Sequence, residues 1–163
     1  MLLNRILKIW MNYLKSQLIL MVFIGVMTYI VNRIVGLPFA FVLAVVAGGC
    51  EVIPRIGPII STAAAAIVAL LQGSNTLPLK NWQFAVLVVL LYGLIQLLEN
   101  WLIQPKIVGS VLNMHPIITI VGMAAFGSVL GVFGVIIAVP VMATVREIVF
   151  YLFYEEKNQD SRL

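Results

Sequence analysis

Charged residues are scarce in this sequence. Only 10% of the 163 residues are charged, whereas 63% are hydrophobic; a soluble domain is about a quarter charged and about half apolar. An aqueous core cannot bury so much apolar surface, so the composition excludes an ordinary soluble domain and predicts an integral membrane protein. At this length we expect one bundle of spans and not several domains.

Cysteine and histidine are almost absent as well. The single cysteine, Cys50, excludes an internal disulfide, and with one histidine, His115, the sequence contains no zinc motif. It also contains no Ser/His/Asp triad or phosphate-binding loop, so we expect no enzyme, no catalytic residue, no metal site and no cofactor. The net charge of +4 comes from basic residues that lie between apolar segments, so we expect no nucleic-acid partner.

The apolar residues form five blocks that we interpret as membrane helices, within a bundle that extends over residues 17–154. The blocks cover residues 18–35, 37–53, 59–71, 82–103 and 116–153. They are preceded by residues 1–16, whose basic face and opposite Leu/Trp face predict an amphipathic helix at the membrane interface; the alternative is a helix from a neighbouring soluble domain. Residues 155–163 form a polar tail, which we expect to be cytoplasmic.

A break with two charged residues interrupts the apolar sequence at residues 48–58. Glu51 and Arg55 flank Pro54, and Gly57 and Pro58 follow directly. Pro54 lacks an N–H and frees a carbonyl one turn back, so a continuous helix cannot run through the segment. Charges and irregular backbone inside a membrane usually face a wet cavity or the protein interior. The segment either binds a cation or lines a path through Glu51 and free carbonyls, or is a tight interfacial turn with a structural Glu51–Arg55 pair.

A second polar group lies on the block at residues 82–103. Polar side chains on one face of an apolar helix predict contact with partners or water instead of lipid. This stripe comprises Tyr92, Gln96, Glu99, Asn100 and Gln104. Glu51 and Glu99 are candidate carriers of a proton or cation; alternatively, Glu99 pairs with Arg55 or Lys106 and only holds helices together. The spacing leaves open whether Glu51 and Glu99 meet in the folded protein.

The last apolar block is too long for one span and contains regularly spaced small residues. Because Gly127, Gly131, Gly134 and Pro140 interrupt it, we expect a helical hairpin that turns at these glycines, which could act as a hinge or allow close packing. The same four-residue spacing recurs in the third block, at Ser61, Ala65, Ala69 and Gly73. The sequence thus predicts an all-α, polytopic helical membrane protein of five to six hydrophobic segments, including a broken helix and a C-terminal helical hairpin.

The basic residues of the loops predict the orientation of these segments. Most of them fall on one side of the zigzag, and only Arg33 and Lys80 fall on the other. Because cytoplasmic loops carry the excess of Lys and Arg, both termini should be cytoplasmic, and residues 73–80 should form an outside loop.

These motifs, in this order, resemble those of the autoinducer-2 exporter family, the PerM-like permeases. Glu51 with Pro54-Arg-Ile-Gly-Pro58 is similar to the family's glutamate–isoleucine–proline–x–isoleucine–glycine–proline signature. The segment 96–109, residues 112–116 and the glycine-containing hairpin resemble its later motifs. The resemblance implies a multi-pass transporter of the bacterial inner membrane that exports a small polar signal, autoinducer-2, or acts as an antiporter of sodium and protons.

The residue patterns described above and the resemblance together give the candidate residues. Candidates for the substrate or ion pathway are Glu51, Pro54, Arg55, Gly57, Pro58, Gln96, Glu99, Asn100 and Gln104; of these, Arg55 departs from the family pattern. Candidates for hinges or packing are Pro105, Gly109, Gly127, Gly131, Gly134 and Pro140. The expected partners are the lipid bilayer and a small polar solute or monovalent cation, with a homo-oligomer left open. Family members are longer, so we expect this sequence to correspond to their C-terminal half; the competing hypothesis is a non-transporting scaffold or an inactive fragment.

Overall fold

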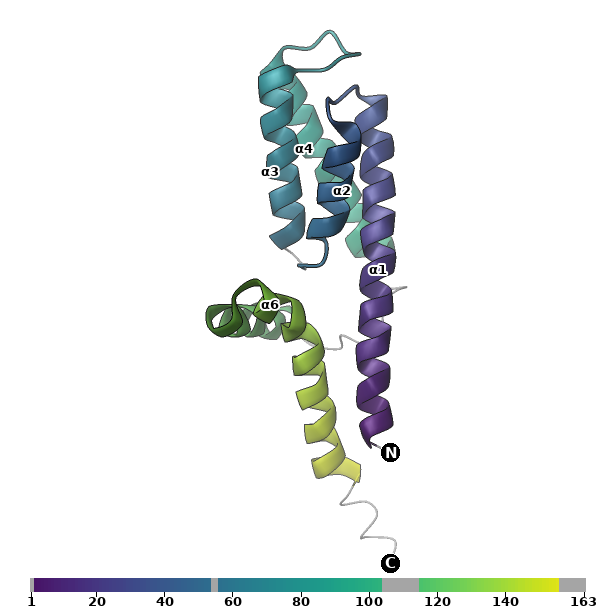
Figure 1. Ribbon diagram of the computed structural model, residues 1–163, viewed down its shortest axis with the longest axis vertical. Coiled ribbons are helices and arrows are strands. Elements are labelled where there is room, and N and C mark those ends of the chain that lie inside the picture. Colours follow the sequence, from purple (N-terminus) through teal and green to yellow (C-terminus); the bar gives the residue numbers. More distant parts are fainter. Residues whose placement is uncertain (1, 54–55, 104–114, 156–163) are drawn as a thin grey trace, which may run out of the picture. The chain divides into compact units, whose positions relative to one another are not determined.

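The computed structural model describes residues 2–53, 56–103 and 115–155, and every regular element in these ranges is helical (Figure 1). The elements are α1 (Leu2–Ile34), α2 (Ala40–Cys50), α3 (Ile56–Gln72), α4 (Asn81–Leu98) with its π-helical continuation η1 (Glu99–Ile103), and α6 (Pro116–Phe150) with its π-helical continuation η2 (Tyr151–Glu155). The all-α fold is confirmed.

Three of the described helices are long and apolar enough to cross a membrane. They cover Leu2–Ile34, Asn81–Ile103 and Ile117–Phe153, while α2 and α3 are shorter apolar helices. These lengths agree with a polytopic helical membrane protein, because a span needs about 20 apolar residues.

Helix α1 is continuous from Leu2 to Ile34, where the sequence predicted two segments. The amphipathic residues and the first apolar block therefore lie on one helix without a break.

The chain divides into two compact units, Gln17–Ile107 and the combination of Met1–Ser16 with Val108–Leu163. The boundary between the units thus falls within α1, next to the end of the predicted amphipathic segment.

The Gln17–Ile107 unit has an apolar core to which α3 contributes only small side chains. Helix α3 packs against both α2 and α4, and the residues that it buries are Gly57, Ser61, Ala65 and Ala69. Small residues let helix backbones approach closely, which explains how α3 fits beside both neighbours. Phe84 and Val88 of α4 fill the same core. The packing role expected from the four-residue spacing is confirmed for Ser61, Ala65 and Ala69.

The predicted C-terminal hairpin is confirmed, and its turn lies at Gly131. This residue has φ 62° and ψ −142°, a non-helical conformation inside α6 that side chains strongly disfavour. After the turn the backbone passes so close to the first arm that a Cβ atom on Gly134 would lie 2.0 Å from the carbonyl oxygen of Phe126. Figure 1 shows the resulting sharp change of direction in α6.

Pro140 lies inside the second arm of the hairpin, and its missing N–H is compensated by another helix. A proline leaves the carbonyl four residues earlier, here that of Ile136, without its helical donor. The buried Tyr13 hydroxyl donates a hydrogen bond to this carbonyl at 3.4 Å. The Trp10 indole N–H also donates to the Thr144 hydroxyl at 3.1 Å. These contacts hold the first four turns of α1 against the second arm.

We expect replacement of Gly134 by alanine to destabilise the hairpin. The added methyl group would collide with backbone, which cannot move aside as a side chain can, so we expect a loss of about 1–3 kcal/mol, typical of overpacking. The measurement is thermal unfolding of the purified protein in detergent. Gly93→Ala is the matched control, because a Cβ atom there meets nothing within 4 Å; equal melting temperatures for the two variants would contradict the close approach.

Candidate carboxyl-pair site

Glu51 and Glu99 meet in the folded protein. Glu51 directly follows α2 and is 3% exposed, while Glu99 is the first residue of η1 and is 0% exposed. Their carboxyl groups are close enough to interact with each other. Two ionised carboxylates buried side by side repel each other strongly. The structure therefore places two interacting acids within an apolar helical bundle.

The end of α2 positions Glu51 by tightening into turns. The N–H groups of residues 51, 52 and 53 donate to the carbonyls of residues 48, 49 and 50, at 3.2, 3.3 and 2.9 Å. The Gln17 side-chain amide donates to the Glu51 carbonyl. Such short-range bonds and side-chain caps satisfy carbonyls that a helix end leaves without partners. The carbonyls expected to be free thus already accept hydrogen bonds, whereas Glu51 Oε2 is buried and has no hydrogen-bond partner among the described residues.

Glu99 lies where the winding of α4 changes from α-helical to π-helical. Its N–H is shared between the carbonyls of Ile95 and Gln96, as is common at the end of an α-helix. Short π-helical turns are rare and frequently occur at functional sites. Within the predicted stripe, Tyr92 and Glu99 are buried, but Gln96 is half-buried and Asn100 is exposed. The structure therefore does not bring Asn100 into the carboxyl-pair site.

Gly57 and Pro58 lie at the start of α3, close to the end of α2. The Gly57 N–H donates to the Ile53 carbonyl at 2.9 Å, and a Cβ atom on Gly57 would lie 2.0 Å from the Cys50 carbonyl oxygen. Gly57 thus allows the first turn of α3 to contact the end of α2, next to Glu51. Five predicted site residues lie outside the described residues, namely Pro54, Arg55, Gln104, Pro105 and Gly109. Lys106, the alternative partner expected for Glu99, also lies outside them.

The structure adds a polar contact that the sequence analysis did not identify. Asn32 of α1 is 1% exposed, and its Nδ2 atom donates to the Tyr92 hydroxyl at 3.0 Å. Its other side-chain atom, Oδ1, is buried without a hydrogen-bond partner among the described residues. Thr28, one turn earlier on the same face, is equally buried. The four-residue spacing of Thr28 and Asn32 in an apolar helix was the signal available in the sequence.

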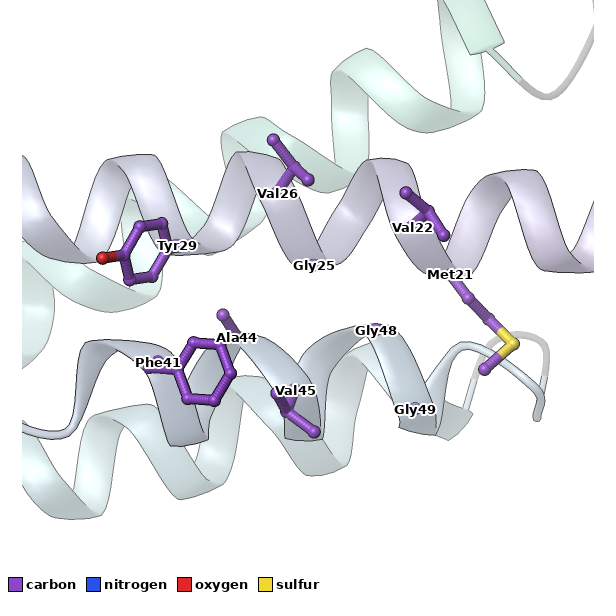
Figure 2. A pocket seen from close by; sticks show the side chains of 10 residues that line it. All are labelled: Met21, Val22, Gly25, Val26, Tyr29, Phe41, Ala44, Val45, Gly48 and Gly49. Atoms are coloured by element: carbon purple, nitrogen blue, oxygen red, sulfur yellow. The ribbon is translucent and has the colours of Figure 1, made fainter.

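An apolar groove of about 610 Å³ lies between α1 and α2 (Figure 2). Gly25 and Gly48 bring the two helices together, since a Cβ atom on Gly48 would lie 2.5 Å from the Met21 carbonyl oxygen. Tyr29 and Phe41 face each other edge to face, with 6.2 Å between their ring centroids. The groove is lined by Met21, Val22, Gly25, Val26, Tyr29, Phe41, Ala44, Val45, Gly48 and Gly49. Its lining contains no charged residue and neither member of the carboxyl pair.

Comparison with known proteins gives one consistent result. Residues 1–153 match the family described as AI-2E family transporter. The candidate transport protein YueF of Bacillus subtilis is 36% identical over 134 residues, which cover 82% of this chain and 34% of YueF. YrrI of the same organism is 33% identical over 136 residues, which cover 83% of this chain and 36% of YrrI. The candidate permease PerM of Escherichia coli is 31% identical over 140 residues, which cover 85% of this chain and 37% of PerM.

The chain thus spans about a third of the length of these relatives. All three relatives are named for transport, and none is named for an enzymatic activity. No solved structure matches the chain.

We expect Tyr92→Phe to destabilise the protein by about 1–3 kcal/mol, because it leaves the Asn32 amide group buried without its acceptor. The double variant Asn32→Leu/Tyr92→Phe should recover much of the loss, since both polar partners are then replaced by apolar groups. Denaturant unfolding in detergent measures both effects. Tyr29→Phe is the control, because the Tyr29 side chain is 40% exposed. A double variant whose loss equals the sum of the single losses would argue against the bond.

Proposed function

The chain belongs to the AI-2E family of transporters, and on that premise we propose that it carries a proton- or cation-binding site of a membrane transporter. The cargo is a small polar signal of the autoinducer-2 type, or sodium exchanged for protons. The observation that carries the proposal is the close approach of the buried carboxyl groups of Glu51 and Glu99. Ionisable groups within membrane segments are costly and mark ion or substrate pathways by default.

The chemistry of the pair supports exchange of a proton for a monovalent cation. Two carboxylates that are both ionised and buried side by side repel each other strongly. A single proton between them relieves this repulsion, and so does a single monovalent cation coordinated by the same oxygens. Proton binding and cation binding are therefore mutually exclusive, and each leaves the pair with the same net charge. That is the requirement for an exchanger, and a proton gradient acting through the same pair could also drive export of a polar solute.

The proposed setting is the bacterial inner membrane with both termini in the cytoplasm. Family membership and the apolar helices support a multi-pass membrane protein. The excess of loop Lys and Arg residues on the side of the termini supports the orientation. The competing function is a membrane scaffold, in which the Glu51–Glu99 contact only holds α2 against α4.

We expect Glu51→Gln and Glu99→Gln each to lower transport at least about tenfold, the effect of roughly 1.4 kcal/mol on a barrier. Glutamine keeps the size and hydrogen-bonding capacity of glutamate but cannot exchange a proton. Because the two acids act as one unit, the double variant should transport little worse than either single variant. The measurement uses purified protein in proteoliposomes, with an internal pH dye during a sodium gradient and, separately, efflux of loaded autoinducer-2.

Glu147→Gln is the matched control for the loss of a carboxylate. Glu147 is partly exposed and bonds with Arg5 at 3.4 Å, and both residues belong to the other compact unit. Its variant should retain normal transport. Normal transport in both Glu51→Gln and Glu99→Gln would remove the pair from the pathway. If the unaltered protein moves neither cargo while remaining folded and inserted, the scaffold function is favoured.

A further inference from the structure

An apolar layer separates the two buried polar pairs of the Gln17–Ile107 unit. Ile24, Ala47 and Ile95 pack together as a buried cluster, with 2%, 2% and 5% of their surfaces exposed. Ala47 lies four residues before Glu51, and Ile95 lies four residues before Glu99. Each is thus about one helical turn, roughly 6 Å, from its acid. The carboxyl pair therefore lies directly beside this layer.

The Asn32–Tyr92 pair lies on the opposite side of the same layer. Along α1 the order on the buried face is Ile24, Thr28 and Asn32, and along α4 it is Tyr92, Ile95 and Glu99. The Asn32–Tyr92 bond and the shared cluster of Ile24 and Ile95 show that α1 and α4 run in opposite directions here. The two polar pairs are consequently about 10 Å apart along the α4 axis, with the apolar layer between them.

We propose that Asn32 Oδ1 binds a water molecule, and that Ile24, Ala47 and Ile95 form a hydrophobic gate between this water and the Glu51–Glu99 pair. The Oδ1 atom is an acceptor that is buried without a donor among the described residues. Such an atom costs free energy unless a donor reaches it, and an internal water is the smallest molecule that can supply one.

A layer of three apolar side chains stops protons because it excludes the water that would carry them. Hydrophobic constrictions in channels close in the same way, by losing water and not by physically blocking the passage. A proton on the carboxyl pair can then reach the Asn32 side only when the layer becomes hydrated. The inference rests on the proposed function in one respect, namely that the carboxyl pair is one end of the path.

A hydroxyl group introduced into the layer should make it leak. We expect Ile95→Ser to raise passive proton leak at least about tenfold, the effect of lowering a barrier by roughly 1.4 kcal/mol. Ala47→Ser is the second test, because it adds one oxygen atom with little change in volume and should preserve folding if Ile95→Ser does not. The readout is decay of an imposed pH gradient in proteoliposomes, followed with an internal dye and without sodium or any solute cargo.

The role of the bound water is tested by combining each leaking variant with Asn32→Leu. If Asn32 Oδ1 holds the water beyond the gate, Asn32→Leu should return the leak towards that of the unaltered protein. The control is Leu94→Ser, because Leu94 is adjacent to Ile95 in α4 but 52% exposed; its variant should not leak.

The possible outcomes distinguish this inference from the proposed function. If Ile95→Ser or Ala47→Ser leaks and Asn32→Leu suppresses that leak, the gate and the water site are both supported, even if neither cargo is transported. Folded serine variants that do not leak would overturn the gate while leaving the carboxyl-pair result intact. Leak that is unaffected by Asn32→Leu would overturn the water site.

Discussion

The contact between the buried carboxyl groups of Glu51 and Glu99 is the constraint on which the Gln17–Ile107 unit depends. Acids buried among apolar helices must be protonated or paired with a positive charge, because an isolated buried charge costs several kcal/mol. The contact also requires the end of α2 and the start of η1 to lie at the same level of the bundle. The irregular backbone on both sides of the contact, a tightened turn after Cys50 and a π-helical turn after Leu98, is consistent with this requirement.

Helix breaks in this protein are compensated by side chains distant in sequence. Pro140 deprives the Ile136 carbonyl of its helical donor, and the Tyr13 hydroxyl takes its place. The Glu51 carbonyl, beyond the end of α2, accepts a hydrogen bond from Gln17. Both donors lie on α1, only four residues apart. Since buried backbone groups in a membrane must find partners within the protein, α1 supplies in each unit a donor that the local helix cannot.

The arrangement of polar residues gives the Gln17–Ile107 unit a layered interior. A pair of buried acids and an amide–hydroxyl pair lie on opposite sides of a layer of aliphatic side chains. Polar groups on both sides of an apolar layer provide binding sites on each side, while the layer itself resists the passage of protons and ions. The apolar groove between α1 and α2 contains none of these polar groups, so the polar interior and the groove are separate features of the unit.

Local chemistry in the sequence by itself determined the all-α fold, the break after Cys50 and the hairpin at Gly131. Apolar run length, the missing N–H of proline and the freedom of glycine act over a few residues and need no information from the rest of the chain. Tertiary structure alone decided that Glu51 meets Glu99, because the two acids lie on separate helices whose relative depth is set by packing. It also decided the burial of Asn32 and the exposure of Asn100. A polar residue in an apolar helix has the same local sequence whether it faces a partner helix or not, and only packing and winding select the face.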